Sequence, residues 1–147
     1  MNDATFVSHL ECSLSGERFP ADTVQNLSQV GKPLLVRYDL EALGQHLTKD
    51  TLSKRPEELW RYREFLPVRQ AANRLSLGEP RTPLLTLDHW SQSQVTVKDE
   101  SRLPTGSFKA RGLCLAVSMA KELGIQRAAM PTNGNAATSS VQRTRQM

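Results

Sequence analysis

A switch in hydrophobic period in the second half of this chain limits what that half can fold into. Residues 94–99 alternate and are rich in β-branched side chains, which predicts a strand. The period then becomes helical, which predicts a helix over 107–123 that ends at Gly124. A second short strand over 125–130, a polar loop and a further helix beginning at 136–137 are expected next. This order is that of a βαβ unit, so the sequence predicts an α/β fold with a parallel sheet.

The first half has weaker patterns, and we expect it to form a small, loop-rich N-terminal lead-in over residues 1–75. Residues 76–147 are then the α/β domain, and this domain opens with a turn-rich stretch over 75–86. Within the lead-in we expect a polar start over 1–31, a strand over 33–37, a helix over 40–47, an exposed connection over 49–56 and a helical pattern over 57–74 that Pro67 interrupts.

Composition excludes several classes of protein. The 147 residues include 19 Lys and Arg against 15 Asp and Glu, and hydrophobic residues make up 38%. There is no apolar run of about 18 residues, which argues against a membrane-spanning helix, and no signal-peptide pattern, so a cytoplasmic protein is expected. The positive excess lies in residues 91–147, without interleaved aromatic residues. It therefore favours a small anionic ligand over nucleic acid.

The two cysteines, Cys12 and Cys114, are too far apart to indicate a disulfide framework, so both are expected to be reduced. Cys114 falls within the helical pattern and is expected in or near the core. Cys12 is the single soft ligand of its region, whereas a closed zinc site needs four ligands. No metal site is predicted.

Two polar loops are expected at the same rim of the sheet, because residues 100–107 and 131–135 each follow a strand and precede a helix. Lys109 lies in the first turn of the first of these helices, where the positive helix terminus, together with burial, would lower the pKa of its amine. A neutral amine beside two anion-binding helix starts suits an aldehyde cofactor with acidic groups, such as pyridoxal phosphate. A solvated surface lysine is the alternative. Neither a P-loop nor a dinucleotide fingerprint has the required spacing here.

The segment from Lys98 to Gly112, KDESRLPTGSFKARG, closely resembles the active-site lysine segment of the threonine synthase family. That family has the pyridoxal-phosphate fold shared with tryptophan synthase β and threonine dehydratase. The resemblance implies the fold, the cofactor pyridoxal 5'-phosphate and a Schiff-base lysine at Lys109. It further implies that Asn135 contacts the cofactor ring hydroxyl and that the loop around it holds the substrate carboxylate. The remaining candidate site residues are Thr132, Asn133 and Gly134 for that carboxylate and Ser107 for the substrate phosphate or the cofactor.

The resemblance runs over residues 10–137, but the chain also departs from the family. No counterpart exists for the family's glycine-rich loop that binds the cofactor phosphate, and the zinc-ribbon cysteines of some relatives are reduced to Cys12. Residues 138–147 are polar where a small apolar helix is expected, which suggests a truncation, or a change of reading frame. The segments that support the resemblance outside the lysine region are Leu10–Gly16, Gly31–Asp39, Leu59–Arg63 and Ser76–Leu85.

The reaction that the resemblance implies is the conversion of O-phosphohomoserine, a small anionic amino acid, to threonine and phosphate. A threonine dehydratase or ammonia-lyase of the same fold is the first alternative. A non-catalytic remnant that cannot complete the cofactor site is the second. Neither nucleic acid nor a membrane is expected as a partner, and assembly of identical chains is left open.

Overall fold

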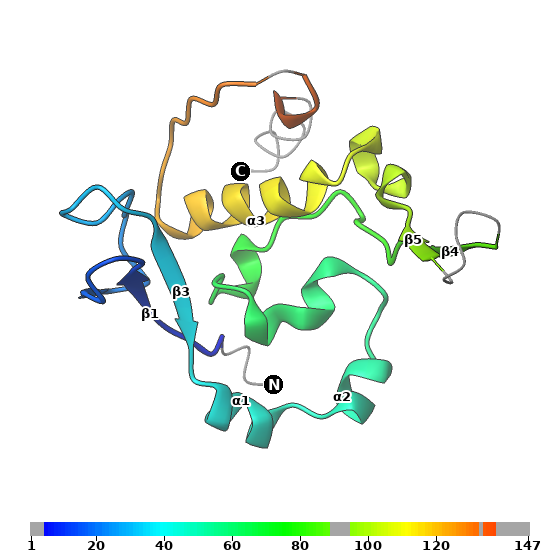
Figure 1. Cartoon of the computed structure of the whole chain (residues 1–147), viewed down its shortest axis with the longest axis horizontal. Helices are drawn as coiled ribbons and strands as arrows, with labels where there is room; N and C mark the ends of the chain where they lie inside the picture. Colours follow the sequence, from blue (N-terminus) through cyan, green and yellow to red (C-terminus); the bar gives the residue numbers. More distant parts are fainter. Residues whose placement is uncertain (1–4, 89–94, 133, 138–147) are drawn as a thin grey trace.

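The computed structural model describes the chain apart from residues 1–4, 89–94, 133 and 138–147. Short strands flank a middle part of helices and 3-10 turns (Figure 1). The elements, in chain order, are the strands β1 (Val7–Cys12), β2 (Arg18–Phe19) and β3 (Leu34–Tyr38), the helices α1 (Leu40–His46) and α2 (Lys49–Ser53), the 3-10 segments η1 (Leu59–Phe65) and η2 (Ala71–Asn73), the strands β4 (Leu84–Leu87) and β5 (Val95–Lys98), the 3-10 turns η3 (Glu100–Arg102) and η4 (Pro104–Gly106), and the helix α3 (Lys109–Glu122).

The lead-in is organised by an antiparallel sheet with the strand order β2-β1-β3. The strand expected at 33–37 is confirmed as β3, and the helix expected at 40–47 is confirmed as α1. The side chain of Asp39 caps α1, because its carboxylate accepts a hydrogen bond of 2.9 Å from the N–H of Ala42.

Residues 49–74 differ in part from what the sequence predicts. The connection expected over 49–56 is exposed, but residues 49–53 within it form the short helix α2, whose first turn is capped by the hydroxyl of Thr48. The helical pattern that follows forms 3-10 segments instead of an α-helix, and Tyr62 within the first segment has non-helical angles. Pro67 lies between the two segments, and its ring cannot continue a helix, so the pattern is interrupted there as expected.

The core lies where these 3-10 segments pack against α3. Trp60, Val68 and Cys114 are buried together, so the core position expected for Cys114 is confirmed. The backbone of Leu75 is held from several sides: its carbonyl accepts hydrogen bonds from the Trp60 indole at 2.8 Å and the Cys114 thiol at 2.9 Å. Its N–H donates to the hydroxyl of Ser118 at 3.0 Å.

The second half contains an antiparallel hairpin, β4 paired with β5. The strand expected at 94–99 is confirmed as β5, whereas β4 arises from a stretch expected to be turn-rich. Residues 125–130 form no strand, so that expectation is wrong, and the described strands pair only in the antiparallel sense. A parallel pair needs cover on both faces, and α3 is the one long helix that the described residues offer for that purpose.

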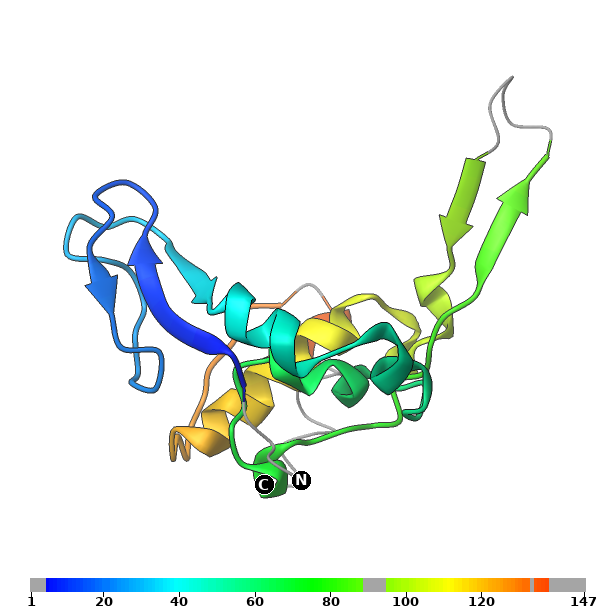
Figure 2. The ribbon, with the colours of Figure 1, turned by 90° about the horizontal axis from the view of Figure 1, so that it is seen from below.

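Helix α3 ends where the sequence predicts, just before Gly124. Gly124 has a φ of 69°, and the N–H groups of Gly124 and Ile125 return to the carbonyls of Lys121 and Ala120 in a Schellman motif. Seen from below, the N-terminal sheet and the β4–β5 hairpin project from opposite ends of the helical middle (Figure 2). None of the helices in the described part of the chain has the length and apolarity needed to cross a bilayer.

Candidate functional site

The turn that leads into α3 has an unusual backbone. Thr105 has a φ of 72° and Gly106 a φ of 62°. Thr105 is the one residue other than glycine with a positive φ among the described residues. A side chain that carries a Cβ adopts this conformation at an energetic cost, and such residues concentrate at functional sites. The strained turn lies four residues before Lys109.

A cluster of Thr82, Glu100 and Arg111 joins the segment before this turn to other parts of the molecule. Arg111 donates to the carboxylate of Glu100 at 2.9 Å and to the carbonyl of Pro80 at 3.0 Å. Glu100 also accepts a hydrogen bond from Thr82, and the amine of Lys98 lies 3.6 Å from its carboxylate. The hydrogen bonds from Arg111, reinforced by Thr82, hold the pKa of Glu100 below its ordinary value against the effect of desolvation. Glu100, which precedes the strained residues, is therefore tied to α3 and to the segment before β4.

Lys109 begins α3, as the sequence predicts. Its side chain is exposed, as in the alternative of a solvated surface lysine. Among the described residues, no ion pair or hydrogen bond engages its amine, whereas the amines of Lys54 and Lys98 are paired with carboxylates. Ser107 is buried, and its hydroxyl accepts a hydrogen bond of 3.3 Å from the N–H of Lys109.

The second predicted loop is stabilised by its own threonine. The hydroxyl of Thr132 accepts hydrogen bonds from the N–H of Gly134 at 3.1 Å and of Ala137 at 3.0 Å. Gly134 has a φ of 128°, and the exposed Asn135 begins a helical turn. Asn133 lies outside the described residues. In this arrangement the hydroxyl of Thr132 shapes the loop.

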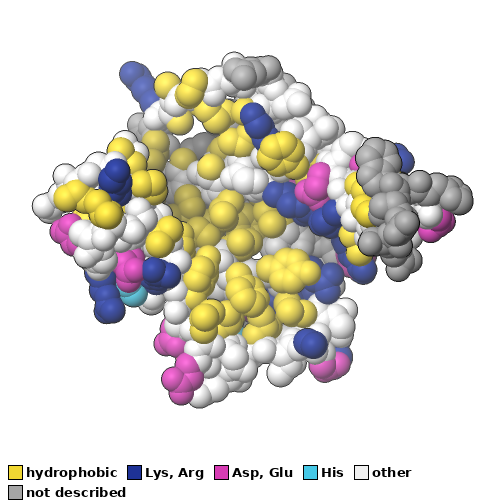
Figure 3. Space-filling view, viewed as in Figure 1, with side chains coloured by type: hydrophobic (Ala, Val, Ile, Leu, Met, Phe, Trp, Pro, Cys, Tyr) yellow, Lys and Arg dark blue, Asp and Glu magenta, His cyan; other side chains and the backbone are white. Residues whose placement is uncertain are grey.

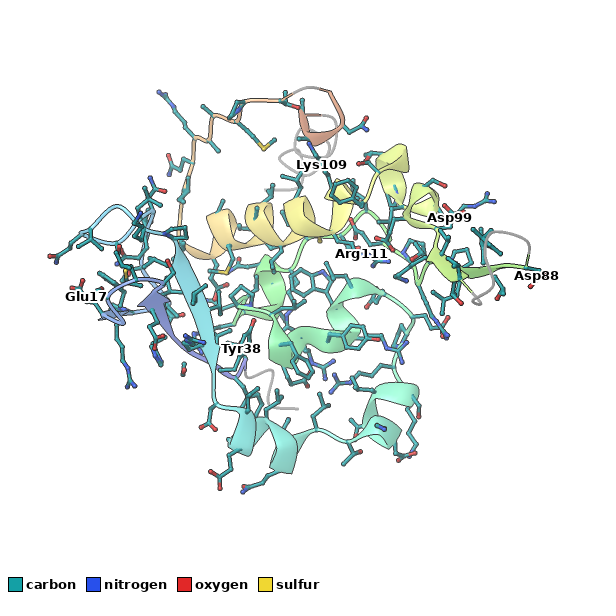
Figure 4. All side chains as sticks on the ribbon, in the orientation of Figure 1. Glu17, Tyr38, Asp88, Asp99, Lys109 and Arg111 are labelled. Carbon is teal, nitrogen blue, oxygen red and sulfur yellow. The ribbon has the colours of Figure 1, made fainter. Side chains whose placement is uncertain are left out.

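The fold brings the two predicted loops to the same end of α3. After Gly124 the chain turns back along the helix, so that the segment 131–137 lies beside the helix start (Figures 1 and 2). Lys109 points to the side of α3 where this segment lies, and Arg111 points to the other side (Figure 4). The described part therefore juxtaposes Lys109 with the Thr132 loop without the parallel sheet that was expected to do so.

Sequence reasoning gave no role to the cluster of Thr82, Glu100 and Arg111. Glu100 and Arg111 both lie within the lysine segment that carried the resemblance, so their charges were visible as a pattern. Thr82 is 18 residues from Glu100 in the sequence and had no such signal. Only the three-dimensional structure shows that these three side chains meet.

Comparisons with known proteins place the chain near one family of enzymes. Residues 75–141 match the family model of "Pyridoxal-phosphate dependent enzyme". The chain is 33% identical over 132 residues to the threonine synthase of Methanocaldococcus jannaschii, a match that covers 87% of this chain and 33% of the relative. It is 32% identical over 132 residues to the threonine synthase of Methanosarcina acetivorans, covering 86% of this chain and 32% of that one.

The threonine synthase of Halalkalibacterium halodurans is 44% identical over 80 residues, which cover 52% of this chain and 23% of the relative. No solved structure matches the chain. The chain spans about a third of the length of the archaeal relatives that it matches. Residues 75–141 are thus similar to the pyridoxal-phosphate dependent enzymes, and the relatives that match most of the chain are threonine synthases.

Proposed function

We propose that this chain carries the lysine-bearing part of a threonine synthase-type enzyme. The observation that carries the proposal is the amine of Lys109 at the start of α3, which no described residue pairs. A left-handed turn precedes it, and the side chain is directed to the side of the Thr132 loop. An unpaired primary amine is the group that can condense with the aldehyde of pyridoxal phosphate.

The donor set fits one end of the cofactor. Lys109 would hold the aldehyde carbon, and Asn135, at the start of the facing helical turn, would meet the ring hydroxyl. When bound, the cofactor supplies an electron sink for carbanion chemistry. Arg111 and Glu100 would hold the lysine turn in place through their contacts with Pro80 and Thr82.

The substrate contacts are assigned by the same proposal. The loop of Thr132, Asn133 and Gly134 would bind a carboxylate, and Ser107 would bind a phosphate group. The substrate is then O-phosphohomoserine, with threonine and phosphate as products, and Lys109 would carry protons between the substrate carbons. A threonine dehydratase would use the same lysine but release ammonia, so product analysis separates the two reactions.

Reductive trapping tests the lysine. The chain is incubated with pyridoxal phosphate, reduced with borohydride and digested, and the modified lysine is identified by mass spectrometry. We expect the label on Lys109, and we expect it to be lost in Lys109→Ala. The matched control is Lys121→Ala, which removes a lysine at the other end of the same helix. A label spread evenly over the lysines would contradict the proposal.

A further inference from the structure

Arg61 in η1 carries a buried positive charge that is only partly satisfied. Its side chain is 12% exposed. One terminal nitrogen of the guanidinium donates to the carbonyl of Leu52 at 2.6 Å, and the other lies 3.9 Å from the carboxylate of Glu57, which is beyond hydrogen-bond distance. The Nε atom is buried and has no hydrogen-bond partner within the described part of the chain. A buried cation without a hydrogen-bonded counter-ion is costly, so an anion beside Arg61 would stabilise it.

Arg61 lines a cavity of about 260 Å³ together with three other basic side chains, Arg81, Lys98 and Arg111. The four come from separate parts of the chain: η1, the loop before β4, the end of β5 and the first turn of α3. Figure 3 shows Lys and Arg side chains gathered between the helical middle and the β4–β5 hairpin. The volume is near the lower end of the range typical of ligand sites, so it suits a small molecule.

Carboxylates already hold part of this positive charge. The guanidinium of Arg81 lies 2.6 Å from the carboxylate of Glu57, and Arg111 donates to Glu100 at 2.9 Å. The amine of Lys98 lies 3.6 Å from Glu100, whose carboxylate it shares with Arg111. Arg61 and Lys98 are therefore the cations with the most capacity left for an added anion.

The balance of charge and the directions of the donors favour phosphate. Four basic and two acidic side chains, the latter Glu57 and Glu58, line the cavity. When Glu100 is added, one positive charge is still in excess. A phosphate ester carries a charge of about −1.5 to −2 at pH 7. Its oxygens are arranged tetrahedrally and accept donors from several directions, whereas a carboxylate offers two oxygens in one plane.

We propose that this cavity is a binding site for a phosphate group, either free or carried by a small molecule, and that Arg61 and Lys98 hold it. The site is separate from the one proposed for the cofactor, because Arg111, which lines the cavity, points to the side of α3 away from Lys109 (Figure 4). It would bind phosphate whether or not Lys109 binds a cofactor.

Thermal unfolding of the full chain tests the site, because a ligand that binds the folded chain raises the unfolding temperature. The chain is titrated with inorganic phosphate and, separately, with glycerol 3-phosphate, each against sodium chloride at the same ionic strength to subtract general screening. We expect a saturable rise with phosphate. A lower midpoint concentration for glycerol 3-phosphate assigns the cavity to a phosphorylated molecule, and an equal or higher one assigns it to free phosphate. No rise with either compound would overturn the proposal.

Substitutions locate the bound phosphate. Arg61→Gln should raise the midpoint concentration of phosphate roughly tenfold or more. Lys98→Gln changes a side chain that is 50% exposed, should raise the midpoint about threefold to tenfold, and serves if Arg61→Gln does not fold. The matched control is Arg102→Gln, which removes a cation that is 72% exposed and lies outside the cavity, and it should leave the midpoint unchanged. Equal midpoints in Lys98→Gln and Arg102→Gln would overturn the proposal.

A last variant separates this cavity from the site beside Lys109, where Ser107 is the proposed phosphate contact. Ser107→Ala should leave the midpoint unchanged. If Ser107→Ala abolishes the stabilisation and Lys98→Gln does not, phosphate binds beside Lys109 and the second site is refuted. Phosphate stabilisation that depends on Lys98, in a chain whose Lys109 takes no label, would overturn the proposed function alone.

Discussion

At the scale of single residues, the buried ion pair between Arg55 and Glu64 is the most demanding feature of the lead-in. The Glu64 side chain is 1% exposed and that of Arg55 13%. The guanidinium donates two hydrogen bonds of 2.7 Å to the carboxylate. Burial acts to raise the pKa of Glu64, but the hydrogen bonds from Arg55 outweigh it and hold that pKa below its ordinary value of 4.5. The charged form is therefore the one that the fold requires.

The substitution Glu64→Gln should lower the free energy of unfolding by about 3 kcal/mol, because it removes the carboxylate charge that accepts two hydrogen bonds from the buried guanidinium of Arg55. Since the folded pKa of Glu64 is depressed, its contribution is complete above pH 4.5 and is lost as the pH falls through the folded pKa. Urea unfolding of wild type and variant between pH 3 and pH 7 measures both effects.

The control is Asp50→Asn, which removes an ion pair of 2.6 Å whose side chains are more than 70% exposed. It should cost less than about 0.5 kcal/mol. If the stability of Glu64→Gln falls with acid as steeply as that of the wild type, the assignment of the acid sensitivity to Glu64 is wrong.

Arg111 is a second residue whose removal should affect both the stability of the chain and the labelling of Lys109. It joins Glu100, Pro80 and the start of α3, so Arg111→Ala should destabilise the chain by about 1–2 kcal/mol. It should also make borohydride labelling less selective for Lys109, because the turn before that lysine loses its brace. Arg102→Ala is the control, since that side chain is 72% exposed and pairs only with the nearby Asp99 among the described residues. Equal labelling in both variants would remove the positioning role of Arg111.

At the scale of the elements, two glycines of α3 differ in the backbone conformation that they need. Gly112 lies near the start of the helix, and Gly124 follows its end. Gly124 needs its φ of 69° to close the Schellman motif, whereas no positive φ is found at Gly112, which lies inside the helix. Neither position would crowd an added Cβ, because no atom lies within 4 Å of it. Backbone conformation alone should therefore decide the effect of alanine at each position.

We expect Gly124→Ala to destabilise the chain by about 1 kcal/mol, the cost of a left-handed residue with a side chain. Gly112→Ala should stabilise it by about 0.5–1 kcal/mol, because alanine is the better helix former. Thermal unfolding of the two variants measures the difference, and a shift of the same sign in both would contradict the role of Gly124 as a cap.

The elements also show which parts of the fold could be predicted from the sequence. Strand β5, strand β3, helix α1 and helix α3 follow from local periodicity and caps, and all are present in the structure. The strand expected at 125–130 depended on a neighbouring parallel strand, which is a tertiary requirement that local pattern cannot establish. The site likewise has one part that local sequence predicts and one part that it does not. The position of Lys109 at a helix start was readable, while the cluster of Thr82, Glu100 and Arg111 depends on contacts between distant segments.

At the scale of the whole molecule, the core draws on both sides of residue 75. Trp60 and Val68 come from the lead-in and Cys114 comes from α3. The carboxylate of Glu122, at the end of α3, accepts hydrogen bonds from the N–H of Arg69 at 3.2 Å and the amide of Asn73 at 2.6 Å. Helix α3 thus holds the 3-10 segments of the lead-in in place, and the division at residues 75 and 76 stays a prediction.

This uneven distribution of contacts should set the order in which the molecule opens. Local stability follows buried apolar contact, so amides in the middle of α3, around the buried Cys114 and Ser118, should exchange their hydrogens most slowly. The amides of Thr86 and Thr96 lie in the projecting hairpin and should exchange among the fastest of any strand. Hydrogen exchange followed by mass spectrometry resolves the two regions. If the hairpin exchanges as slowly as α3, buried apolar contact does not set the local stability of this molecule.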